Sequence, residues 1–219
     1  MAMNAPEAPP RPPAVILAGG RSSRMGRPKV GLVLDGRTML DRIVERLAPQ
    51  ADVIALNLNA APGIDLPPGL AVVADTVPGY FGPLAGILTA MRHAAQAAPH
   101  AAHVLTVPAD TPFFPDDLVA RLSAAPDLEG RIAVACSDGE MHPLIALWPI
   151  AIADDLEAWI RTDSKLRARA FIARHPSSTV DFPMVDTKAG PLDPFFNINT
   201  PEELREAEGW LQRLKDRKQ

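Results

Sequence analysis

Short apolar runs alternate with helical patterns along most of this chain, and this alternation restricts the fold more than any other feature. The run AVILA at 14–18 is apolar throughout and ends at two glycines, which is typical of a parallel strand buried on both faces. In TMLDRIVERLAPQ, at 38–50, the apolar residues fall on one face of a helix. We therefore expect an α/β protein: a three-layer α/β/α sandwich, Rossmann-like, with a mostly parallel central sheet.

Further elements follow from the same two patterns. Strands are expected at 52–59, 70–75, 102–110, 131–137, 142–149 and 178–184, and helices at 83–98, 115–125, 150–161 and 165–174. The last helix is expected to begin after Thr200, because TPEEL places Thr200 as the N-cap, Pro201 at the first position and Glu203 at the third. Only DGEM separates the strands at 131–137 and 142–149, which indicates a hairpin.

Composition narrows the class of protein. The net charge of −4 argues against general nucleic-acid binding, which needs a basic face. No apolar stretch approaches the roughly 20 residues that span a bilayer, so no membrane association is expected. The single cysteine, Cys136, cannot form an internal disulfide, which fits a cytoplasmic protein.

The first 13 residues, MAMNAPEAPPRPP, have a composition unlike the rest of the chain. They are rich in proline and alanine and lack the apolar core of a signal peptide. We therefore expect a disordered Pro-rich tail over 1–13. The sequence shows no interdomain linker beyond it, and residues 14–219 are expected to form a single domain.

Glycine and polar residues gather where the predicted strands end. The sequence GGR follows the strand at 14–18, Asn57 lies near the end of the strand at 52–59, and Asp75 and Asp110 each end a strand. In an open α/β sheet, ligands bind beyond the carboxyl ends of the strands. These residues are therefore expected to share one site.

The loop after the first strand concentrates positive charge. Gly19 and Gly20 let the backbone approach a ligand closely, and four basic side chains follow: Arg21, Arg24, Arg27 and Lys29. The loop has neither the G-x-G-x-x-G spacing of dinucleotide-binding proteins nor the G-K-[ST] of a P-loop. Like charges this close repel one another until an anion arrives, so we interpret the loop as a phosphate site. The alternative is a solvated basic turn.

Asp110, in VPADTPFFP, is the candidate metal ligand. Mg²⁺ takes one or two protein carboxylates and completes its shell with water and phosphate oxygens. A carboxylate at the end of a buried strand, beside a phosphate loop, suits this ion. The alternative is that Asp110 only caps a turn.

Asparagines occur in two N-x-N pairs. Asparagine is unfavourable in strands, so Asn57 and Asn59 in LNLN need a polar partner on the face that they share, unless they only cap the strand end. Asp75 is able to accept hydrogen bonds from a ribose, or from the adjacent N1–H and N2–H donors that guanine has and that cytosine and adenine lack. Asn197 and Asn199, in FFNINTP, precede the last helix, and capping does not explain them.

No Ser-His-Asp or Cys-His catalytic set is expected, and the histidines do not match a zinc spacing. His142 is interpreted as a loop or strand-edge residue. A phosphate monoester, however, is already largely ionised at pH 7, since its second pKa is about 6. A reaction with such a nucleophile needs cations and alignment rather than a general base.

These motifs resemble the nucleotidyltransferase family with the signature LAGG-x-S-x-RMG-x-x-K, and within it the molybdenum cofactor guanylyltransferases, or molybdopterin-guanine dinucleotide synthases. The likeness covers about residues 14–208 and includes FGPLAGI, VPADTPFFP, HPLIALW and FFNINTPEEL. It implies a nucleotidyltransferase fold. It also implies an Mg²⁺-dependent enzyme that converts GTP and molybdenum–molybdopterin into the guanine dinucleotide cofactor and pyrophosphate.

The resemblance further implies roles for individual residues. Catalysis would rest on Arg24, Lys29 and Asp110, with Asp110 as the Mg²⁺ ligand. Asn197 and Asn199 would lie on the pterin side. Contacts with the nucleotide would come from Leu17, Ala18, Gly19, Gly20, Lys29, Asn57, Asp75 and Asp110.

The chain departs from the family pattern at MGRPKVGL, which is one residue shorter before the lysine than the usual MGG-x-D-K-[GA]-L. Two alternatives therefore stay open. One is transfer of CMP or another nucleotide on the same fold, and the other is a non-catalytic module that binds nucleotide and molybdopterin for delivery. A monomer is expected, with transient contacts to other molybdenum cofactor biosynthesis proteins and to apo-molybdoenzymes.

Overall fold

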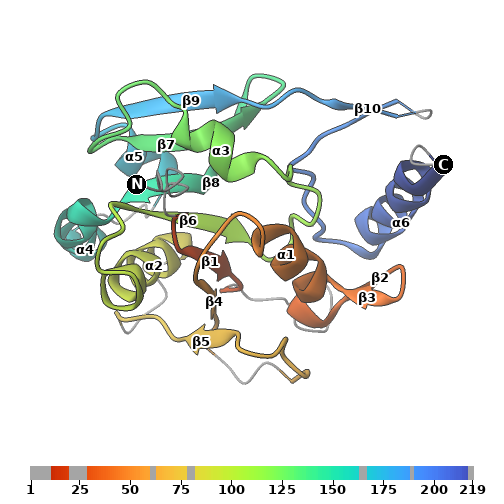
Figure 1. The fold of residues 1–219 in the computed structure, drawn as a ribbon, viewed down its shortest axis with the longest axis horizontal. Coiled ribbons are helices and arrows are strands. Elements are labelled where there is room, and N and C mark those ends of the chain that lie inside the picture. Colours follow the sequence, from red (N-terminus) through yellow and green to blue (C-terminus); the bar gives the residue numbers. More distant parts are fainter. Residues whose placement is uncertain are drawn as a thin grey trace, which may run out of the picture.

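The structure is a computed structural model, and it describes residues 11–19, 29–59, 63–77, 82–162, 167–187 and 190–216. A seven-stranded sheet runs through the centre (Figure 1). Strand β8 is antiparallel to both of its neighbours, and the other pairings in this sheet are parallel. The prediction of a mostly parallel sheet is therefore confirmed. In spatial order the strands are β5 (Ala71–Val73), β4 (Ile54–Asn57), β1 (Ala14–Leu17), β6 (His103–Pro108), β8 (Glu140–Pro149), β7 (Ile132–Ser137) and β9 (Ser177–Asp181).

Alternate side chains of the strands enter two separate cores, one on each face of the sheet. Ile16 belongs to the core that contains apolar residues of α1 (Met39–Leu47) and α3 (Leu118–Ser123). Val15 belongs to the core with α2 (Pro83–Ala97), α4 (Ala153–Thr162) and α5 (Ala168–Ile172). Helices thus cover both faces, and the expected three-layer α/β/α sandwich is confirmed. Two short 3₁₀ turns, η1 (Lys29–Gly31) and η2 (Ile150–Ile152), complete these layers.

Helix α3 is shorter than its sequence predicts. The predicted helix at 115–125 would place Pro115 in the first turn, but the helix begins only at Leu118 and the three residues before it form a turn. A side chain from another element explains the start: Gln50 Oε1 accepts the N–H of Val119, and Gln50 Nε2 donates to Pro115 O. Gln50 therefore satisfies a donor that a local cap would otherwise take.

The predicted hairpin between β7 and β8 is confirmed. Its turn residues, Asp138 and Gly139, both have positive φ, of 48° and 77°, as a two-residue hairpin turn of the favoured twist requires. Two smaller hairpins were not predicted, because strands of two or three residues leave no periodic pattern. They are formed by β2 (Val33–Leu34) with β3 (Arg37–Thr38), and by β10 (Val185–Thr187) with β11 (Gly190–Leu192).

Helix α6 (Pro201–Asp216) lies beside β2 and β3, at a distance from the central sheet (Figure 1). Its predicted start is confirmed: Thr200 Oγ1 accepts the N–H of Glu203, while Glu203 Oε2 accepts the N–H of Thr200. Trp210 packs in a third core together with Leu34. Among the described residues, no helix has the length and apolarity needed to cross a bilayer.

Of the predicted N-terminal tail, only residues 11–13 are among those described. Pro13 is buried, and its carbonyl accepts the N–H of Leu105 at 2.9 Å. Arg11 is exposed and donates its backbone N–H to Asp52 at 3.0 Å. The chain therefore contacts the sheet just before β1 begins. The expectation for residues 1–10 lies outside the described part of the chain.

Candidate functional site

The carboxyl ends of four neighbouring parallel strands meet at one edge of the sheet, which we call the carboxyl edge. Leu17 at the end of β1 pairs with Asn57 of β4 on one side and with Pro108 of β6 on the other. Asn57 in turn pairs with Val73 of β5. The structure therefore brings the following predicted site residues to this edge: Leu17, Ala18, Gly19, Asn57, Asp75 and Asp110.

Asp75 is held by two asparagine side chains. Its Oδ1 accepts from Asn57 Nδ2 at 2.9 Å and its Oδ2 accepts from Asn59 Nδ2 at 2.6 Å. Asn59 Oδ1 also accepts the backbone N–H of Asp75 at 2.7 Å. The polar partner that the LNLN sequence requires is thus Asp75 itself. A carboxylate has about four acceptor positions, so each oxygen keeps one for a ligand.

Helix α2 approaches Asn57 so closely that the contact requires glycine. A Cβ placed on Gly86 would lie 2.7 Å from Asn57 Oδ1 and 3.1 Å from a methyl carbon of Leu17. Asn57 is 1% exposed, so its amide has little room to move away. Gly86 lies in the FGPLAGI segment, and its missing side chain makes space for the asparagine that holds Asp75.

Asp110 lies against the segment that carries Asn197. The carbonyl of Asp110 accepts the N–H of Ile198 at 2.9 Å, and the buried Thr111 hydroxyl donates to Asn197 Oδ1 at 2.6 Å. Asp110 itself is half-buried, whereas Asn197 is exposed. The predicted metal ligand and one of the predicted pterin-side residues are therefore neighbours. The other, Asn199, is half-buried beside the start of α6 and donates its N–H to Glu203 Oε2.

A serine, a histidine and an aspartate come together near the ends of β7 and β11 and the start of β8, but not in the order of a catalytic set. Ser137 Oγ lies 2.7 Å from His142 Nε2 and donates to Asp193 Oδ1 at 2.8 Å. Because the hydroxyl has one proton and gives it to Asp193, His142 must donate from Nε2. The order is His–Ser–Asp, with the serine in the middle and 1% exposed. In a hydrolase triad the histidine lies in the middle and takes the serine proton, so these residues do not form a nucleophilic set.

Burial shifts the pKa of His142 within this cluster and of Cys136 beside it. Desolvation lowers the pKa of His142 below its ordinary value, and the negative charge of Asp193 opposes the shift only in part. Desolvation likewise raises the pKa of the Cys136 thiol, as do Asp181 and Glu140. A thiol with a raised pKa is a poor nucleophile at neutral pH, so Cys136 is not a candidate nucleophile.

The predicted phosphate loop falls mostly outside the described part of the chain. Gly20 and Arg24 lie there, and so does the side chain of Lys29, whose backbone begins η1. Their roles stay predictions. On the metal, the described residues contain no group of three or more His, Cys, Asp or Glu side chains that could hold an ion. The role of Asp110 as a metal ligand also stays a prediction.

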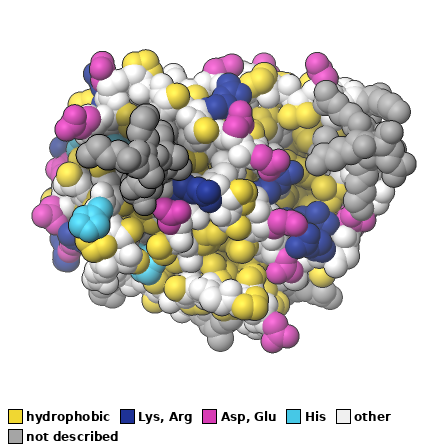
Figure 2. All heavy atoms as spheres, viewed as in Figure 1, with side chains coloured by type: hydrophobic (Ala, Val, Ile, Leu, Met, Phe, Trp, Pro, Cys, Tyr) yellow, Lys and Arg dark blue, Asp and Glu magenta, His cyan; other side chains and the backbone are white. Residues whose placement is uncertain are grey.

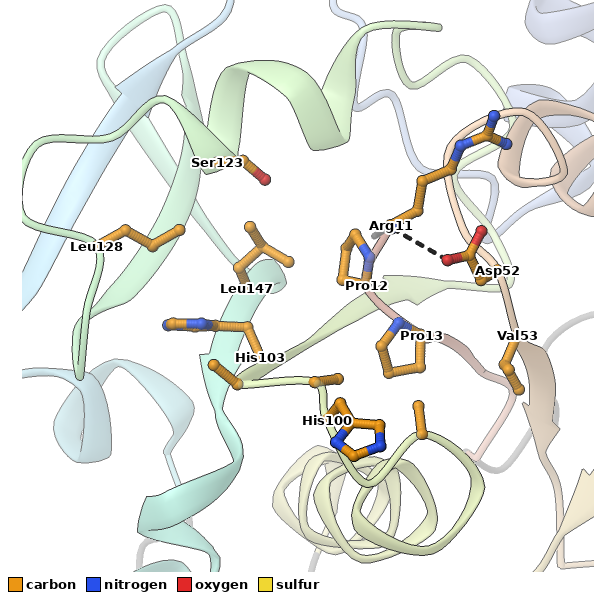
Figure 3. Close-up of a pocket in the computed structure, with 13 residues that line it drawn as sticks. Arg11, Pro12, Pro13, Asp52, Val53, His100, His103, Ser123, Leu128 and Leu147 are labelled. Carbon is orange, nitrogen blue, oxygen red and sulfur yellow. Dashed lines mark hydrogen bonds between the residues drawn. The ribbon is translucent and has the colours of Figure 1, made fainter. Parts of the chain in front are cut away.

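A cavity of about 410 Å³ lies at the opposite end of the sheet, which we call the amino edge. In Figure 3 it is bordered by the Pro12–Pro13 segment that leads into β1, by His100 after α2, and by His103 at the start of β6. Leu128 and Leu147 supply apolar walls. Of the predicted site residues that the structure describes, none lines this cavity.

Charges of both signs are interspersed on the face of the molecule seen in Figure 2. Dark blue Lys and Arg side chains lie singly among magenta Asp and Glu, and no continuous basic patch forms among the coloured residues of this face. The arrangement agrees with the net charge of −4.

The contacts of several residues at the carboxyl edge were not predicted from the sequence. Thr111 stands next to a predicted residue, but nothing local indicates that its hydroxyl reaches Asn197. Ser137 and Asp193 are 56 residues apart and belong to no shared motif. The requirement for a polar partner did point to Asn59, but its partner could only be found from the pairing of β4 with β5.

Comparison with known proteins points to one family. Residues 14–180 match the family described as MobA-like NTP transferase domain. The chain is 68% identical over 206 residues to a molybdenum cofactor guanylyltransferase of Rhizobium meliloti, and the match covers 94% of each chain.

Solved structures show the same fold at low identity. A molybdopterin-guanine dinucleotide biosynthesis protein A from Archaeoglobus fulgidus superposes with a TM-score of 0.66 at 20% identity, over 91% of this chain and 98% of the other. A Mycobacterium tuberculosis protein, whose crystal structure is a complex with manganese, superposes with a TM-score of 0.64 at 18% identity, over 91% and 98%.

Proposed function

The chain belongs to the family of MobA-like NTP transferase domains, and on that premise we propose that it transfers GMP from GTP to molybdenum–molybdopterin. The products are the molybdenum guanine dinucleotide cofactor and pyrophosphate. The relative at 68% identity, named a molybdenum cofactor guanylyltransferase, supports this choice of donor and acceptor.

One structural observation carries the proposal: two carboxylates with different surroundings share the carboxyl edge. Asp75 is fixed by the amides of Asn57 and Asn59 and keeps an acceptor position on each oxygen. A guanine base presents two adjacent N–H donors that match this pair. Asp110 lies two residues beyond β6 and contacts the segment with Asn197. On this proposal, the donor base and the acceptor would bind at separate places on one edge.

The reaction requires alignment more than acid–base chemistry. A phosphate oxygen of molybdopterin attacks the α-phosphorus of GTP, the new P–O bond forms, and the bond between the α-phosphorus and the bridging oxygen to the β-phosphate breaks. Pyrophosphate leaves with that electron pair. The attacking phosphate is already largely ionised near pH 7, so no side chain needs to remove a proton. This accounts for a site in which the Ser137–His142–Asp193 cluster supplies no base.

A divalent cation fits Asp110, and we propose Mg²⁺. Asp110 is half-buried at the end of a buried strand, and Mg²⁺ needs only one or two protein carboxylates when phosphates supply the rest. When bound, such an ion offsets the negative charge that the triphosphate and pyrophosphate carry. The manganese in the Mycobacterium tuberculosis relative supports a divalent metal in this fold.

The basic loop would bind the triphosphate. We propose that Gly19 and Gly20 offer backbone N–H groups, that Lys29 binds the phosphates, and that Arg24 stabilises the transferring phosphoryl group. Leu17 and Ala18 would contact the nucleoside from the end of β1. We further propose that residues 14–219 work as one domain, as a cytoplasmic monomer, and that contacts with other cofactor-biosynthesis proteins and with apo-molybdoenzymes are transient.

A panel of nucleoside triphosphates tests the proposal. Purified protein with molybdopterin and Mg²⁺ should release pyrophosphate with GTP at least about tenfold faster than with CTP, ATP or UTP, since only guanine matches Asp75 as an adjacent donor pair. Faster release with CTP would overturn the guanine assignment but keep the reaction type. If none of the four nucleotides leads to pyrophosphate release, although GTP raises the melting temperature, the protein would be only a binding module.

A further inference from the structure

The Ser137–His142–Asp193 cluster has no part in the proposed chemistry, yet it is a complete hydrogen-bonded chain. Ser137 Oγ accepts from His142 Nε2 and donates to Asp193 Oδ1. His142 lies near the start of β8 and Ser137 ends β7, so the β7–β8 hairpin supplies two members. Since β8 runs antiparallel to β6, both members lie at the carboxyl edge.

Asp193 connects the Ser137–His142 pair to the segment before α6. The same Oδ1 that accepts the Ser137 hydroxyl also accepts the backbone N–H of Phe195 at 2.8 Å. The carbonyl of Asp193 accepts the N–H of Phe196 at 3.1 Å, which closes a turn. Asn197 is the next residue along the chain. The position of Asn197 therefore depends on a turn that is anchored to Ser137.

Ring contacts hold the same turn from a second side. The ring of His142 packs against that of Phe195 with centroids 4.7 Å apart, and Phe195 meets Phe182 edge-on at 5.2 Å. Phe182 and Phe195 are fully buried. His142 thus contacts the turn twice, through Ser137 to the Asp193 carboxylate and directly through its ring. A residue with only a packing role would not need the first connection.

We propose that Ser137, His142 and Asp193 are positioning residues for the acceptor substrate: they hold the turn at 193–196 so that Asn197 and Asn199 meet the phosphorylated pterin. The inference rests on the proposed function. It assigns the cluster to the acceptor side alone, because the groups that fix Asp75 come from Asn57 in β4 and from Asn59 just after β4.

Steady-state kinetics with Ser137→Ala tests the inference. Loss of the bridging hydroxyl should raise the KM for molybdopterin about tenfold and leave the KM for GTP within about twofold. Ser137→Thr, which keeps a hydroxyl, should restore most of the affinity.

Thr106→Val is the matched control. Thr106 is a buried hydroxyl of the same sheet that donates to Leu144 O and accepts from Trp148 Nε1, and neither partner belongs to residues 193–199. The Thr106→Val variant should lower the melting temperature about as much as Ser137→Ala does, and it should leave the KM values for GTP and molybdopterin unchanged.

Each remaining outcome counts against one idea only. If wild-type protein releases no pyrophosphate from GTP and molybdopterin, the proposed function fails. If wild-type protein is active and Ser137→Ala changes both KM values equally or neither, the positioning inference fails. Should Ser137→Ala not fold, His142→Leu and His142→Gln replace it: Leu removes the N–H donor and should raise the KM for molybdopterin, whereas Gln keeps a donor and should not. Equal KM values for these two variants would overturn the inference.

Discussion

The two edges of the central sheet differ in which side chains they bring together. At the amino edge a cavity of about 410 Å³ is lined mostly by prolines, alanines and leucines, with scattered polar residues such as His100 and His103. At the carboxyl edge Asp75 and Asp110 are held among asparagines, a threonine and backbone N–H groups. The cavity has volume, and the carboxyl edge has convergent chemistry. Volume alone would select the amino edge, whereas the converging polar side chains favour the carboxyl edge.

Helix direction gives a physical reason for this difference. Helix α2 begins at Pro83, reaches Asn57 through Gly86 within its first turn or so, and ends at Ala97. Ala98 and His100, just beyond its last residue, line the cavity. The N-terminus of a helix carries partial positive charge and its C-terminus partial negative charge. A phosphate is therefore favoured at the carboxyl edge and disfavoured at the amino edge.

The largest effect should come from exchanging a carboxylate for an amide at each edge. Asp110→Asn keeps the shape of the side chain but removes the charge that a cation needs, and turnover should fall at least about 100-fold with the fold intact. Asp52→Asn, at the amino edge, should leave turnover within about twofold. Pyrophosphate release and the melting temperature are measured for both variants. Near-normal turnover of Asp110→Asn, with an unchanged Mg²⁺ requirement, would reduce Asp110 to a turn cap.

Two helical glycines allow a sharper comparison. Gly86→Ala places a methyl group 2.7 Å from Asn57 Oδ1, so we expect a loss of about 1–3 kcal/mol in the free energy of unfolding and weaker GTP binding. Gly209→Ala in α6 is the control, because the nearest atoms to its Cβ lie 3.9 Å away. That variant should gain up to about 1 kcal/mol from helix propensity. Chemical denaturation measures the free energy of unfolding, and titration measures the affinity for GTP. Unchanged GTP affinity in Gly86→Ala would contradict a role of the Gly86–Asn57 contact in GTP binding.

The sequence predicted the carboxyl edge for a reason that does not depend on side-chain detail. Once Asn57, Asp75 and Asp110 are assigned to the ends of parallel strands, the topology brings them together. The start of α3 could not be predicted, because Gln50 satisfies the N–H of Val119 from 69 residues away. The hydrogen bond from Ser137 to Asp193 could not be predicted for the same reason. Contacts between distant segments depend on the finished packing, and no local pattern encodes them.

Acidification should weaken both edges, and it should affect catalysis at only one of them. Burial lowers the pKa of His142 and of His103 below the ordinary 6.5. The unfolded chain therefore takes up these protons first, so the free energy of unfolding should be highest above pH 6.5 and fall below it. Around His142, Asp193 and Glu140 oppose the shift and Arg169 adds to it.

Replacing each histidine by glutamine separates the two edges. Either His142→Gln or His103→Gln should make the loss of stability between pH 7.5 and about pH 5 smaller, since one proton-uptake site disappears from the unfolded chain. Denaturation at several pH values measures this. At every pH, the KM of His103→Gln for molybdopterin should equal that of the wild-type protein. A stability profile that neither variant alters would mean that both histidines titrate normally in the folded protein.

The smallest effect should come from removing residues 1–12, which takes Arg11 and Pro12 away from the amino edge. The lost contact that the structure describes is one exposed hydrogen bond, from Arg11 N to Asp52. Such a bond contributes about 0.5–1.5 kcal/mol, which corresponds to a fall of a few degrees in the melting temperature of a chain of this size. Pro13 remains, and its carbonyl still accepts the N–H of Leu105 at 2.9 Å, so β1 keeps its place beside β6. Because the carboxyl ends of these strands are then undisturbed, turnover should stay within about twofold. A much larger loss of turnover at an unchanged melting temperature would mean that the removed residues act at the carboxyl edge, and the functional separation of the two edges would have to be abandoned.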